Sequence, residues 1–447
     1  MREKDSDVTS RVFSTTVRTC LRSSPLIQPS ILQPTRRGLI LGASGLTAAC
    51  ATTRAPARSD AVRFAATQAV LDRYVADGSL PGATVGLRLP GGDRAYLQAG
   101  TQDYIPSPAM NRDSLFRIYS MTKPVTGAAA ALLVEDGRLS LDQPVVDFIP
   151  EFARLTVATD PANSLAARPA TQIMTIRHLL THTSGLTYNI MGNGPVQKAY
   201  RRAGIFPFTG DLGAVPGDGP KVTDLDEMVR RLGEIPLLFE PGRAWHYSVS
   251  LDVLGLVIQR ASGMTFEDFL QRRLFDPIGM DDTRWRLGGG DARRTAAVYD
   301  YAGEGRRPAA GASIAAYSAP VTLFAGGAGL ISSTRDYLDF MTMLLDGGRA
   351  GRVRVMDPAT ARLIRTDILP AGTTPQFSPE DGFGFGGSVA AASKPNAGEF
   401  GWSGAAGTRG WVDPANDMAG VVMVQFFNAE IGLVAETRAA IARDMAS

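Results

Sequence analysis

Residues 115–124 read Leu115-Phe116-Arg117-Ile118-Tyr119-Ser120-Met121-Thr122-Lys123-Pro124, and the apolar stretch from Val125 to Val134 follows directly. Proline is tolerated in the first turn of a helix, because its missing N–H would have no partner there. The position of Pro124 therefore predicts that a helix begins near Ser120. Residues three apart lie on one face of a helix, so the Lys123 amine should lie over the Ser120 hydroxyl.

This serine and lysine form an unusual pair in this composition. The chain has 27 serines and five lysines, and Ser120 with Lys123 is its one pair with Ser-x-x-Lys spacing. A helix N-terminus offers free N–H groups and a positive dipole end to a developing oxyanion. Lysine can activate a hydroxyl when burial or a neighbouring charge lowers its pKa. Taken alone, the spacing is equally compatible with a capping serine and a surface lysine.

The sequence lacks the motifs that other kinds of nucleophilic or metal-dependent enzyme require. No Gly-x-Ser-x-Gly pentapeptide occurs, which excludes the nucleophile elbow of α/β-hydrolases. The two cysteines, Cys20 and Cys50, lie in the N-terminal segment, so the remainder has no thiol nucleophile, disulfide or cysteine-based zinc site. With three histidines in the chain, we expect neither a metal centre nor a cofactor. We interpret His182 as a residue that orders a loop by hydrogen bonding.

Length and charge set further limits. A chain of 447 residues exceeds the roughly 250–300 residues that one hydrophobic core supports, so two lobes are expected. Residues 1–50 hold seven Lys or Arg against three Asp or Glu, and the remaining residues hold 39 against 41. This balance argues against nucleic acid as a partner. No apolar run reaches the ~18 residues of a membrane span.

The two ends of the chain have complementary patterns. Residues 61–77 have helical spacing and precede alternating segments at Ala83–Leu89 and Arg94–Ala99, which read as a hairpin. Near the C-terminus, strands are expected at Thr408–Val412 and Met418–Phe427, followed by a helix over Ile431–Met445. Together the ends predict an α+β fold, in which an antiparallel sheet is flanked by N- and C-terminal helices.

The middle of the chain predicts a mainly helical lobe. We expect this lobe over about residues 115–345, and the sheet lobe over about 61–114 and 346–447. Residues 192–221 contain seven Gly and four Pro and read as a long loop, which is usually functional or mobile in a compact domain.

Residues 1–50 are interpreted as an export signal and residues 51–60 as a linker. Arg36 and Arg37 precede the apolar stretch Gly38–Leu46, which resembles a twin-arginine signal. Cys50 lies in an imperfect lipoprotein box, so a lipid anchor competes with cleavage after Ala51. We expect an exported protein that is periplasmic or anchored to a membrane by lipid.

Several segments resemble one family. Residues 115–123 look like the nucleophile motif of the serine β-lactamase and penicillin-binding-protein superfamily. Three further segments fit the class C-like branch in family order: Leu179-Leu180-Thr181-His182-Thr183-Ser184-Gly185-Leu186, then Tyr247-Ser248-Val249, then Phe400-Gly401-Trp402-Ser403-Gly404-Ala405-Ala406-Gly407-Thr408. The resemblance covers roughly residues 62–445 and is greatest to the family VIII carboxylesterases.

The departures from class C β-lactamases concern two motifs. Val249 occupies the place of an asparagine, and Trp402-Ser403-Gly404 replaces Lys-Thr-Gly. The missing lysine would have supplied a cation for the carboxylate of a lactam. An apolar tryptophan therefore favours neutral esters over anionic antibiotics.

The resemblance implies roles for individual residues. Ser120 would be the nucleophile, with Lys123 and Tyr247 sharing its proton, and the backbone N–H groups of Ser120 and Ala405 would bind the oxyanion. Five residues would contact the substrate: Trp402, Ser403, Gly404, Tyr119 and Tyr188. Aromatic residues of the region 188–225 are further candidates for the pocket wall: Tyr188, Tyr200, Phe206 and Phe208.

The implied reaction is hydrolysis of a small-molecule ester through an acyl-enzyme. An acyltransferase would use the same residues. A D-amino-acid peptidase or weak β-lactamase is disfavoured by Trp402 and Val249. A non-catalytic binding module of this fold should have lost Ser120, Lys123 or Tyr247, and all three are present.

Overall fold

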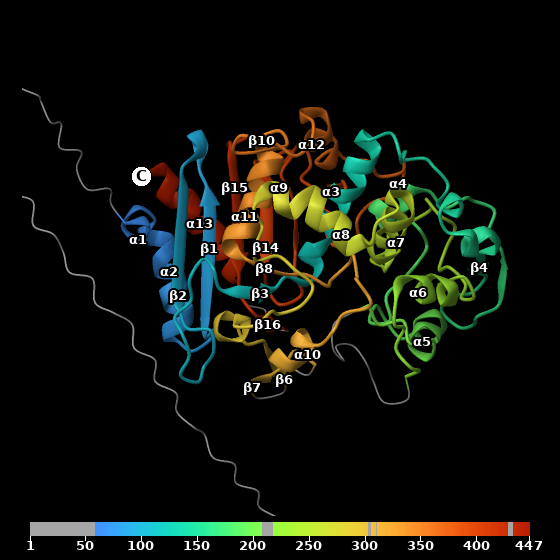
Figure 1. Cartoon of the computed structure of the whole chain (residues 1–447), viewed down its shortest axis with the longest axis horizontal. Coiled ribbons are helices and arrows are strands. Elements are labelled where there is room, and N and C mark those ends of the chain that lie inside the picture. Colours follow the sequence, from blue (N-terminus) through green and yellow to red (C-terminus); the bar gives the residue numbers. More distant parts are fainter. Residues whose placement is uncertain (1–58, 208–217, 303–304, 310, 428–431) are drawn as a thin grey trace, which may run out of the picture. The chain divides into compact units, whose positions relative to one another are not determined.

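The structure is a computed structural model that describes residues 59–207, 218–302, 305–309, 311–427 and 432–447 (Figure 1). The expected export signal at 1–50 and nearly all of the expected linker at 51–60 lie outside the described residues. Residues 58–447 form one compact unit. Within the described ranges, no helix is both long enough and apolar enough to cross a membrane.

The centre of this unit is a seven-stranded sheet in which every neighbouring pair is antiparallel. The strands lie in the order β11-β12-β13-β14-β15-β1-β2. Their bounds are β1 (Gly82–Arg88), β2 (Arg94–Gly100), β11 (Gly382–Phe383), β12 (Ser388–Val389), β13 (Phe400–Ser403), β14 (Arg409–Asp413) and β15 (Met418–Met423). The β1–β15 pairing joins the first strand of the sheet to the last, so both predicted hairpins belong to one sheet.

Helices cover both faces of this sheet, as Figure 1 shows. α2 (Ala65–Ala76) and α13 (Leu433–Ala446) lie on one face, where Val85 and Leu87 of β1 join their apolar cluster. α11 (Thr334–Leu345) covers the other face, where a Cβ on Gly86 would lie 2.9 Å from the Thr334 side chain. β1 is consequently buried along its whole length. The predicted α+β fold, with terminal helices flanking an antiparallel sheet, is confirmed.

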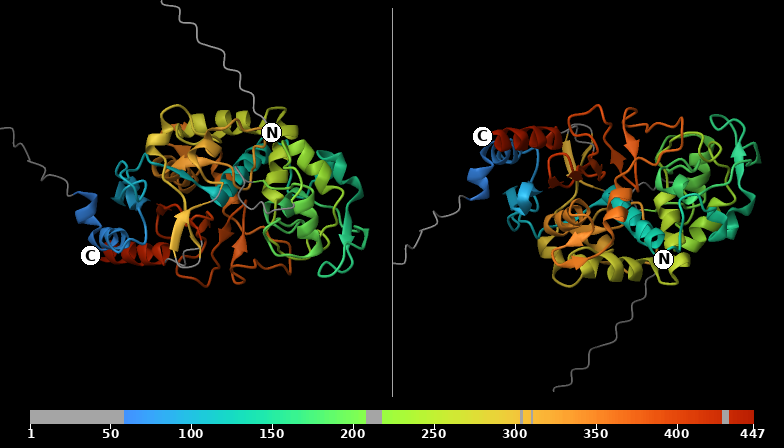
Figure 2. Two further views of the ribbon diagram at one scale, coloured as in Figure 1. Left: turned by 90° about the horizontal axis from the view of Figure 1, so that it is seen from below. Right: turned by 90° about the horizontal axis from the view of Figure 1, so that it is seen from above.

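Beside the sheet, α3 (Thr122–Glu135) is the central helix of the helical region. Twelve of its 14 residues are buried, and both views of Figure 2 show this teal helix between the orange-to-red strands and the green helices. A Cβ on Gly127 would lie 2.1 Å from the Phe385 carbonyl oxygen, so only glycine allows the helix to approach the segment between β11 and β12. The start of α3 is therefore fixed against the end of the sheet that carries β13.

Further elements complete the unit. The other α-helices are α1 (Asp60–Arg63), α4 (Ile176–Leu180), α5 (Pro195–Arg202), α6 (Leu225–Leu232), α7 (Ser250–Ser262), α8 (Phe266–Leu270), α9 (Asp276–Ile278), α10 (Ile314–Ser318) and α12 (Pro358–Ile364). The short 3-10 and π segments are η1 (Pro90–Gly92), η2 (Tyr119–Met121), η3 (Val145–Asp147), η4 (Pro150–Arg154), η5 (Gln271–Phe275) and η6 (Asp291–Arg294). The small sheets contain β3 (Leu115–Arg117), β4 (Thr156–Ala158), β5 (Ala167–Pro169), β6 (Tyr299–Ala302), β7 (Gly305–Pro308), β8 (Ile331–Ser333), β9 (Arg349–Ala350), β10 (Val353–Arg354) and β16 (Phe426–Phe427).

The prediction of one strand over Met418–Phe427 is wrong beyond Met423. β16 leaves the main sheet and pairs with β6 in parallel. The break is at Gln425, whose buried amide accepts a hydrogen bond from the Arg117 N–H at 3.0 Å and donates one to the Arg117 carbonyl at 3.0 Å. A side chain thus replaces a backbone partner and joins β3 to the end of β15.

The expected loop over residues 192–221 contains α5. Val196, Ala199 and Tyr200 are buried at helical spacing, and Pro195 occupies the first turn, so the glycine and proline content concealed a short amphipathic helix. Residues 208–217 lie outside the described ranges. The division into two lobes stays a prediction, although α11 lies on the sheet and not with the helices that precede it.

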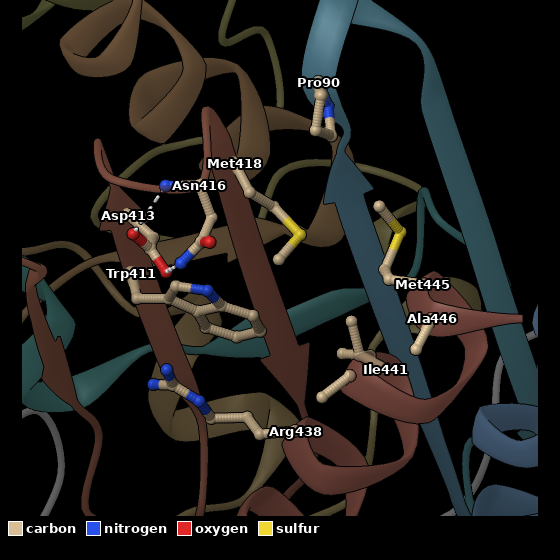
Figure 3. A pocket seen from close by; sticks show the side chains of 10 residues that line it. Pro90, Trp411, Asp413, Asn416, Met418, Arg438, Ile441, Met445 and Ala446 are labelled. Atoms are coloured by element: carbon tan, nitrogen blue, oxygen red, sulfur yellow. Dashed lines mark hydrogen bonds between the residues drawn. The ribbon is translucent and has the colours of Figure 1, made fainter. Parts of the chain in front are cut away.

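A cleft of about 410 Å³ lies between the sheet and α13 (Figure 3). Trp411 of β14 covers Gly420, where a Cβ would lie 2.1 Å from the indole ring. The guanidinium carbon of Arg438 is 4.9 Å from the centre of the Trp411 ring. This packing fixes Arg438 of α13 beside β14.

Candidate active site

Three polar side-chain atoms meet at the start of α3. Ser120 lies in η2, directly before the helix, as the position of Pro124 predicts. Lys123 Nζ donates a hydrogen bond to Ser120 Oγ at 3.2 Å, and the Tyr247 hydroxyl donates one to the same oxygen at 2.6 Å. The structure therefore brings together the three residues that the sequence selected, from two segments 124 or more residues apart.

Ser120 is held by backbone contacts on both sides. The preceding strand, β3, pairs with β8 and is tied to β15 by Gln425. After it, the Met121 carbonyl accepts a hydrogen bond from the Tyr337 hydroxyl at 2.8 Å. Tyr119 has a φ of +43°, a strained conformation for a bulky residue that is held where the surroundings over-determine it. This strain lies directly beside the Ser120 hydroxyl.

Lys123 is fully buried, and its amine has two oxygen partners. Besides Ser120 Oγ, Nζ donates to the Gly327 carbonyl at 2.7 Å. The Gly327 N–H in turn donates to Asp252 Oδ1 at 2.8 Å, and the Tyr188 hydroxyl donates to Asp252 Oδ2 at 3.2 Å. Asp252 thus fixes the peptide that orients the lysine amine.

Asp252 was not among the predicted site residues. It is fully buried in α7, and burial raises its pKa to about 6, although the nearby Lys123 charge acts in the opposite direction. The signal in the sequence was a single carboxylate in the apolar run Leu251–Ile258. A buried carboxylate costs free energy unless it has partners, and here those partners lead directly to the amine.

His182 orders a loop, as expected. Its Nδ1 is 3.0 Å from Ser248 Oγ, and its carbonyl accepts a hydrogen bond from the His246 N–H at 2.9 Å. Burial lowers the pKa of His182 well below its usual value, so the ring is neutral at neutral pH. The ring centre is 4.8 Å from that of Tyr247, and the histidine therefore supports the tyrosine from behind.

A cleft of about 410 Å³ opens on Ser120 and Tyr247. Its other lining residues are Phe377, Ser378, Ser388, Trp402, Ser403, Gly404, Ala405 and Arg409. Trp402 Nε1 donates to the Tyr247 hydroxyl at 3.3 Å, so the indole forms a wall beside the reacting atoms. The cleft is lined by all four residues that the resemblance assigned to substrate or oxyanion binding on the third motif: Trp402, Ser403, Gly404 and Ala405.

The turn between β13 and β14 approaches Ser120 closely. A Cβ on Gly404 would lie 2.1 Å from Thr408 Oγ1 and 2.5 Å from the Ile118 carbonyl oxygen, so this position requires glycine. Neither the Ser120 N–H nor the Ala405 N–H donates a hydrogen bond to another described residue. Both residues line the cleft, which is the arrangement that two oxyanion donors need.

Two predicted substrate contacts lie behind the cleft. Tyr119 is 2% exposed, packs against Phe427 and Ala406, and does not line the cleft. Tyr188 is 1% exposed and contacts Asp252 and Lys123. The structure therefore does not support either residue as a direct substrate contact. They shape the core that carries Ser120 and Lys123.

The sequence also predicts other aromatic residues of the region 188–225 for the pocket wall. Tyr200 and Phe206 are buried, and Phe208 lies outside the described residues. The exposed aromatic at the cleft is Phe377, whose ring centre is 5.7 Å from that of Tyr247. Phe377 lies in an irregular segment without periodicity, so no sequence pattern indicated it.

Arg409 lines the cleft, so a cation lies near the third motif although Trp402 takes the place of the motif's lysine. Arg409 is the first residue of β14, directly opposite Ser403 in the strand register. The third motif lies on β13, whereas this charge comes from the neighbouring strand. The missing lysine was one reason to expect a preference for neutral esters, and the Arg409 guanidinium weakens that reason.

Among the described residues, no three His, Cys, Asp or Glu side chains gather in a way that could hold a metal ion. The polar chemistry of the described site is that of a serine hydroxyl, an amine and a phenol.

The chain belongs to the Beta-lactamase family, whose model matches residues 67–443. This confirms the resemblance to the serine β-lactamase and penicillin-binding-protein superfamily.

The chain is similar to several named proteins. Protein Rv1367c of Mycobacterium tuberculosis is 35% identical over 73% of this chain and 81% of its own length. Esterase EstB of Burkholderia gladioli is 39% identical over 50% of this chain and 52% of its own length. The solved structure of EstCE1, described as a hydrolase with promiscuous acyltransferase activity, has a TM-score of 0.70 and 24% identity over 86% of this chain and 99% of its own.

The Asp252 carboxyl predicts a measurable pH dependence of stability. An unfolded aspartate titrates near pH ~3.9, whereas Asp252 titrates at about 6 in the folded protein. Its contribution to stability is therefore complete below the unfolded pKa and is lost as the pH rises through about 6. Asp252→Asn removes this dependence. Relative to wild type, the variant's free energy of unfolding should rise by roughly 3 kcal/mol between about pH 3 and 7.

Urea denaturation at several pH values, with refolding as the check of reversibility, measures this difference. A difference that stays constant over the whole range would show that folding leaves the pKa of Asp252 unchanged, and would contradict the prediction.

Proposed function

We propose that this protein is a serine carboxylesterase-type enzyme that cleaves carboxylic esters through an acyl-enzyme on Ser120. The observation that carries the proposal is the convergence of Lys123 Nζ and the Tyr247 hydroxyl on Ser120 Oγ, at the mouth of a cleft. The named esterase among its relatives, EstB, supports the same class of reaction.

The first half-reaction forms the acyl-enzyme. Ser120 Oγ attacks the ester carbonyl carbon, and its proton passes to the Lys123–Tyr247 pair as the new C–O bond forms. The C–O bond to the alcohol then breaks, and the same pair returns the proton to the departing alkoxide. Both groups are within hydrogen-bond distance of Oγ, as proton transfer requires.

The second half-reaction releases the acid. Water attacks the acyl carbon, gives its proton to the pair, and Ser120 leaves with that proton restored. In both halves the carbonyl oxygen becomes negative between the Ser120 and Ala405 N–H groups. Removal of one such donor typically costs ~3 kcal/mol of transition-state stabilisation.

An alcohol could replace water in the second half-reaction, which would make the enzyme an acyltransferase. EstCE1, a protein of this fold, is described as having both activities, so this is the second candidate. Product analysis during ester hydrolysis in the presence of 1-butanol separates the two: a butyl ester indicates transfer and free acid alone indicates hydrolysis.

Ser120→Ala should abolish hydrolysis of short p-nitrophenyl esters and leave the fold intact, because no other hydroxyl among the described residues receives both proton-transfer groups. An organophosphonate probe should label Ser120 in the wild type. Ser378→Ala is the matched control, since Ser378 lines the same cleft, and labelling should persist in it. Wild-type rates in Ser120→Ala, or labelling of a different serine, would exclude this mechanism.

Lys123→Ala and Tyr247→Phe should each lower kcat at least ~100-fold, the range for a lost acid–base group. Because the two groups share one proton transfer, the double variant should be little worse than the poorer single variant. Steady-state kinetics with p-nitrophenyl butyrate give kcat for the wild type, the two single variants and the double variant. Strictly multiplicative losses would mean that the residues act independently.

We also propose that residues 1–50 direct export, to the periplasm or to a lipid anchor at Cys50. Replacement of Arg36 and Arg37 by lysine should leave precursor in the cytoplasm if the twin-arginine route is used, and cell fractionation detects it. Normal export of that variant would exclude the route. Palmitate labelling that is lost in Cys50→Ser would support the anchor, and its absence from wild type would exclude it.

A further inference from the structure

A second cavity, of about 370 Å³, shares no lining residue with the cleft at Ser120. Its wall includes the residues that follow β7, the strand at the lower edge of Figure 1, and part of the segment that leads into β6. Most of the described side chains that line it are small or apolar, but Arg117 of β3 is among them. Arg117 precedes Ser120 by three residues, so the cavity adjoins the segment that carries the nucleophile.

Arg117 is buried in this cavity without an acidic partner. It is 1% exposed, and its Nη1 donates a hydrogen bond to the Ala296 carbonyl at 3.2 Å. Its Nε and Nη2 are buried and have no hydrogen-bond partner among the described residues. Burial lowers the pKa of Arg117, against the opposing influence of two phenols, yet a guanidinium stays charged in proteins. A buried charge of this kind is costly unless an opposite charge pairs with it.

The two free nitrogens form one edge of the Arg117 guanidinium. The N–H groups of Nε and Nη2 on that edge are parallel, which matches the two oxygens of a carboxylate. The face of the guanidinium is occupied by the Tyr317 ring, whose centre is 4.0 Å from the guanidinium carbon. Leu115 lies on the same face of β3 and packs against the same ring. The side chain is therefore held in one orientation, and its two-donor edge is left for another group.

The other charged residues of the cavity leave this edge unpaired. Asp103 lines the cavity, but its carboxylate accepts a hydrogen bond from the Tyr299 hydroxyl. Arg293 also lines the cavity and is exposed. The three charged lining residues therefore sum to one positive charge, which suits a monoanion. The small and apolar wall suits a ligand with a hydrocarbon part, because burial of such surface is favourable.

We propose that this cavity binds a small monocarboxylate. Its two oxygens accept hydrogen bonds from Nε and Nη2 of Arg117, and its hydrocarbon part lies along the apolar wall. The site is separate from the cleft at Ser120, and the inference goes beyond the proposed esterase function without depending on it. Short-chain acids of defined length are the probes that fit this description.

The cavity wall also supports the nucleophile segment from behind. The Tyr119 ring packs in one apolar cluster with Ala406 and with two residues of the cavity wall. Tyr119 precedes Ser120, and Ala406 follows Ala405, so this cluster lies beside both residues whose N–H groups are assigned to the oxyanion. A carboxylate that neutralises Arg117 therefore stabilises the part of the fold that carries these two donors.

Ligand-observed NMR titration of the wild type tests the site, with sodium butyrate as the probe and butyramide as its neutral counterpart. Butyrate should bind at least about tenfold more tightly than butyramide, in keeping with charge-assisted hydrogen bonds. Affinity should rise from acetate to butyrate, because each added methylene buries apolar surface. Butyrate should also raise the thermal unfolding temperature as its concentration increases. Chloride and inorganic phosphate are tested as competitors of bound butyrate at constant ionic strength.

Substitutions locate the bound carboxylate. Arg117→Met keeps an unbranched side chain beside Tyr317 and should weaken butyrate binding at least about tenfold. Arg117→Lys retains the buried charge without the two-donor edge, so its affinity should lie between those of wild type and Arg117→Met. Arg293→Gln and Arg409→Gln are matched controls, since they remove an exposed guanidinium of this cavity and the guanidinium of the cleft at Ser120. Each control should change the affinity less than about threefold. Thermal unfolding without ligand shows which variants are folded, and Arg117→Lys alone suffices if Arg117→Met is not.

Three results would overturn the inference. Equal affinities for butyrate and butyramide would show that no cation holds the ligand. A loss of affinity in Arg409→Gln together with wild-type affinity in Arg117→Lys would place the carboxylate in the cleft at Ser120. Displacement of butyrate by chloride or phosphate at concentrations below its own would assign the cavity to an inorganic ion. Failure of the proposed esterase function leaves all these outcomes unchanged, because none of the measurements uses catalysis.

Discussion

Burial of the Lys123 amine is the constraint on which the site depends. A buried amine needs oxygen partners, and the protein supplies the Gly327 carbonyl and the Ser120 hydroxyl. Asp252 accepts a hydrogen bond from the N–H of the same glycine, and the turn that starts α3 carries the hydroxyl. The buried amine therefore links α7, the segment after α10 and the nucleophile. The aromatic rings of Tyr188 and Tyr247 surround the amine, with their centres 5.3 Å and 4.5 Å from Nζ.

Local patterns in the sequence were sufficient for the Ser120–Lys123 pair and for four of the seven strands of the main sheet. The Pro124 position predicted the helix start, and the spacing of Ser120 and Lys123 predicted their contact. Alternation of apolar residues predicted the N-terminal hairpin, and the turn at 413–417 between two apolar segments predicted the C-terminal one. Tyr247 came from the family resemblance, since no local pattern links it to a serine 127 residues earlier.

What the sequence did not predict depends on contacts between distant segments. Gln425 interrupts β15 because its amide pairs with β3, and this pairing has no periodic signature. Arg409 lines the cleft because β14 lies beside β13, and Tyr119 fails to line it because its strained backbone turns the ring into the core. Each of these positions becomes visible only once two strands or turns are placed side by side.

The pairing of β1 with β15 also constrains how the protein is made. Thr84 pairs with Met423, so the middle of the sheet closes only after almost the entire described chain has been synthesised. Contacts this far apart in sequence form slowly, because a long loop must be ordered first. During translation Ser120 and Lys123 emerge long before Ala405 and β13. A nascent chain therefore carries its nucleophile without an oxyanion site, and its ability to react begins with completion of the fold.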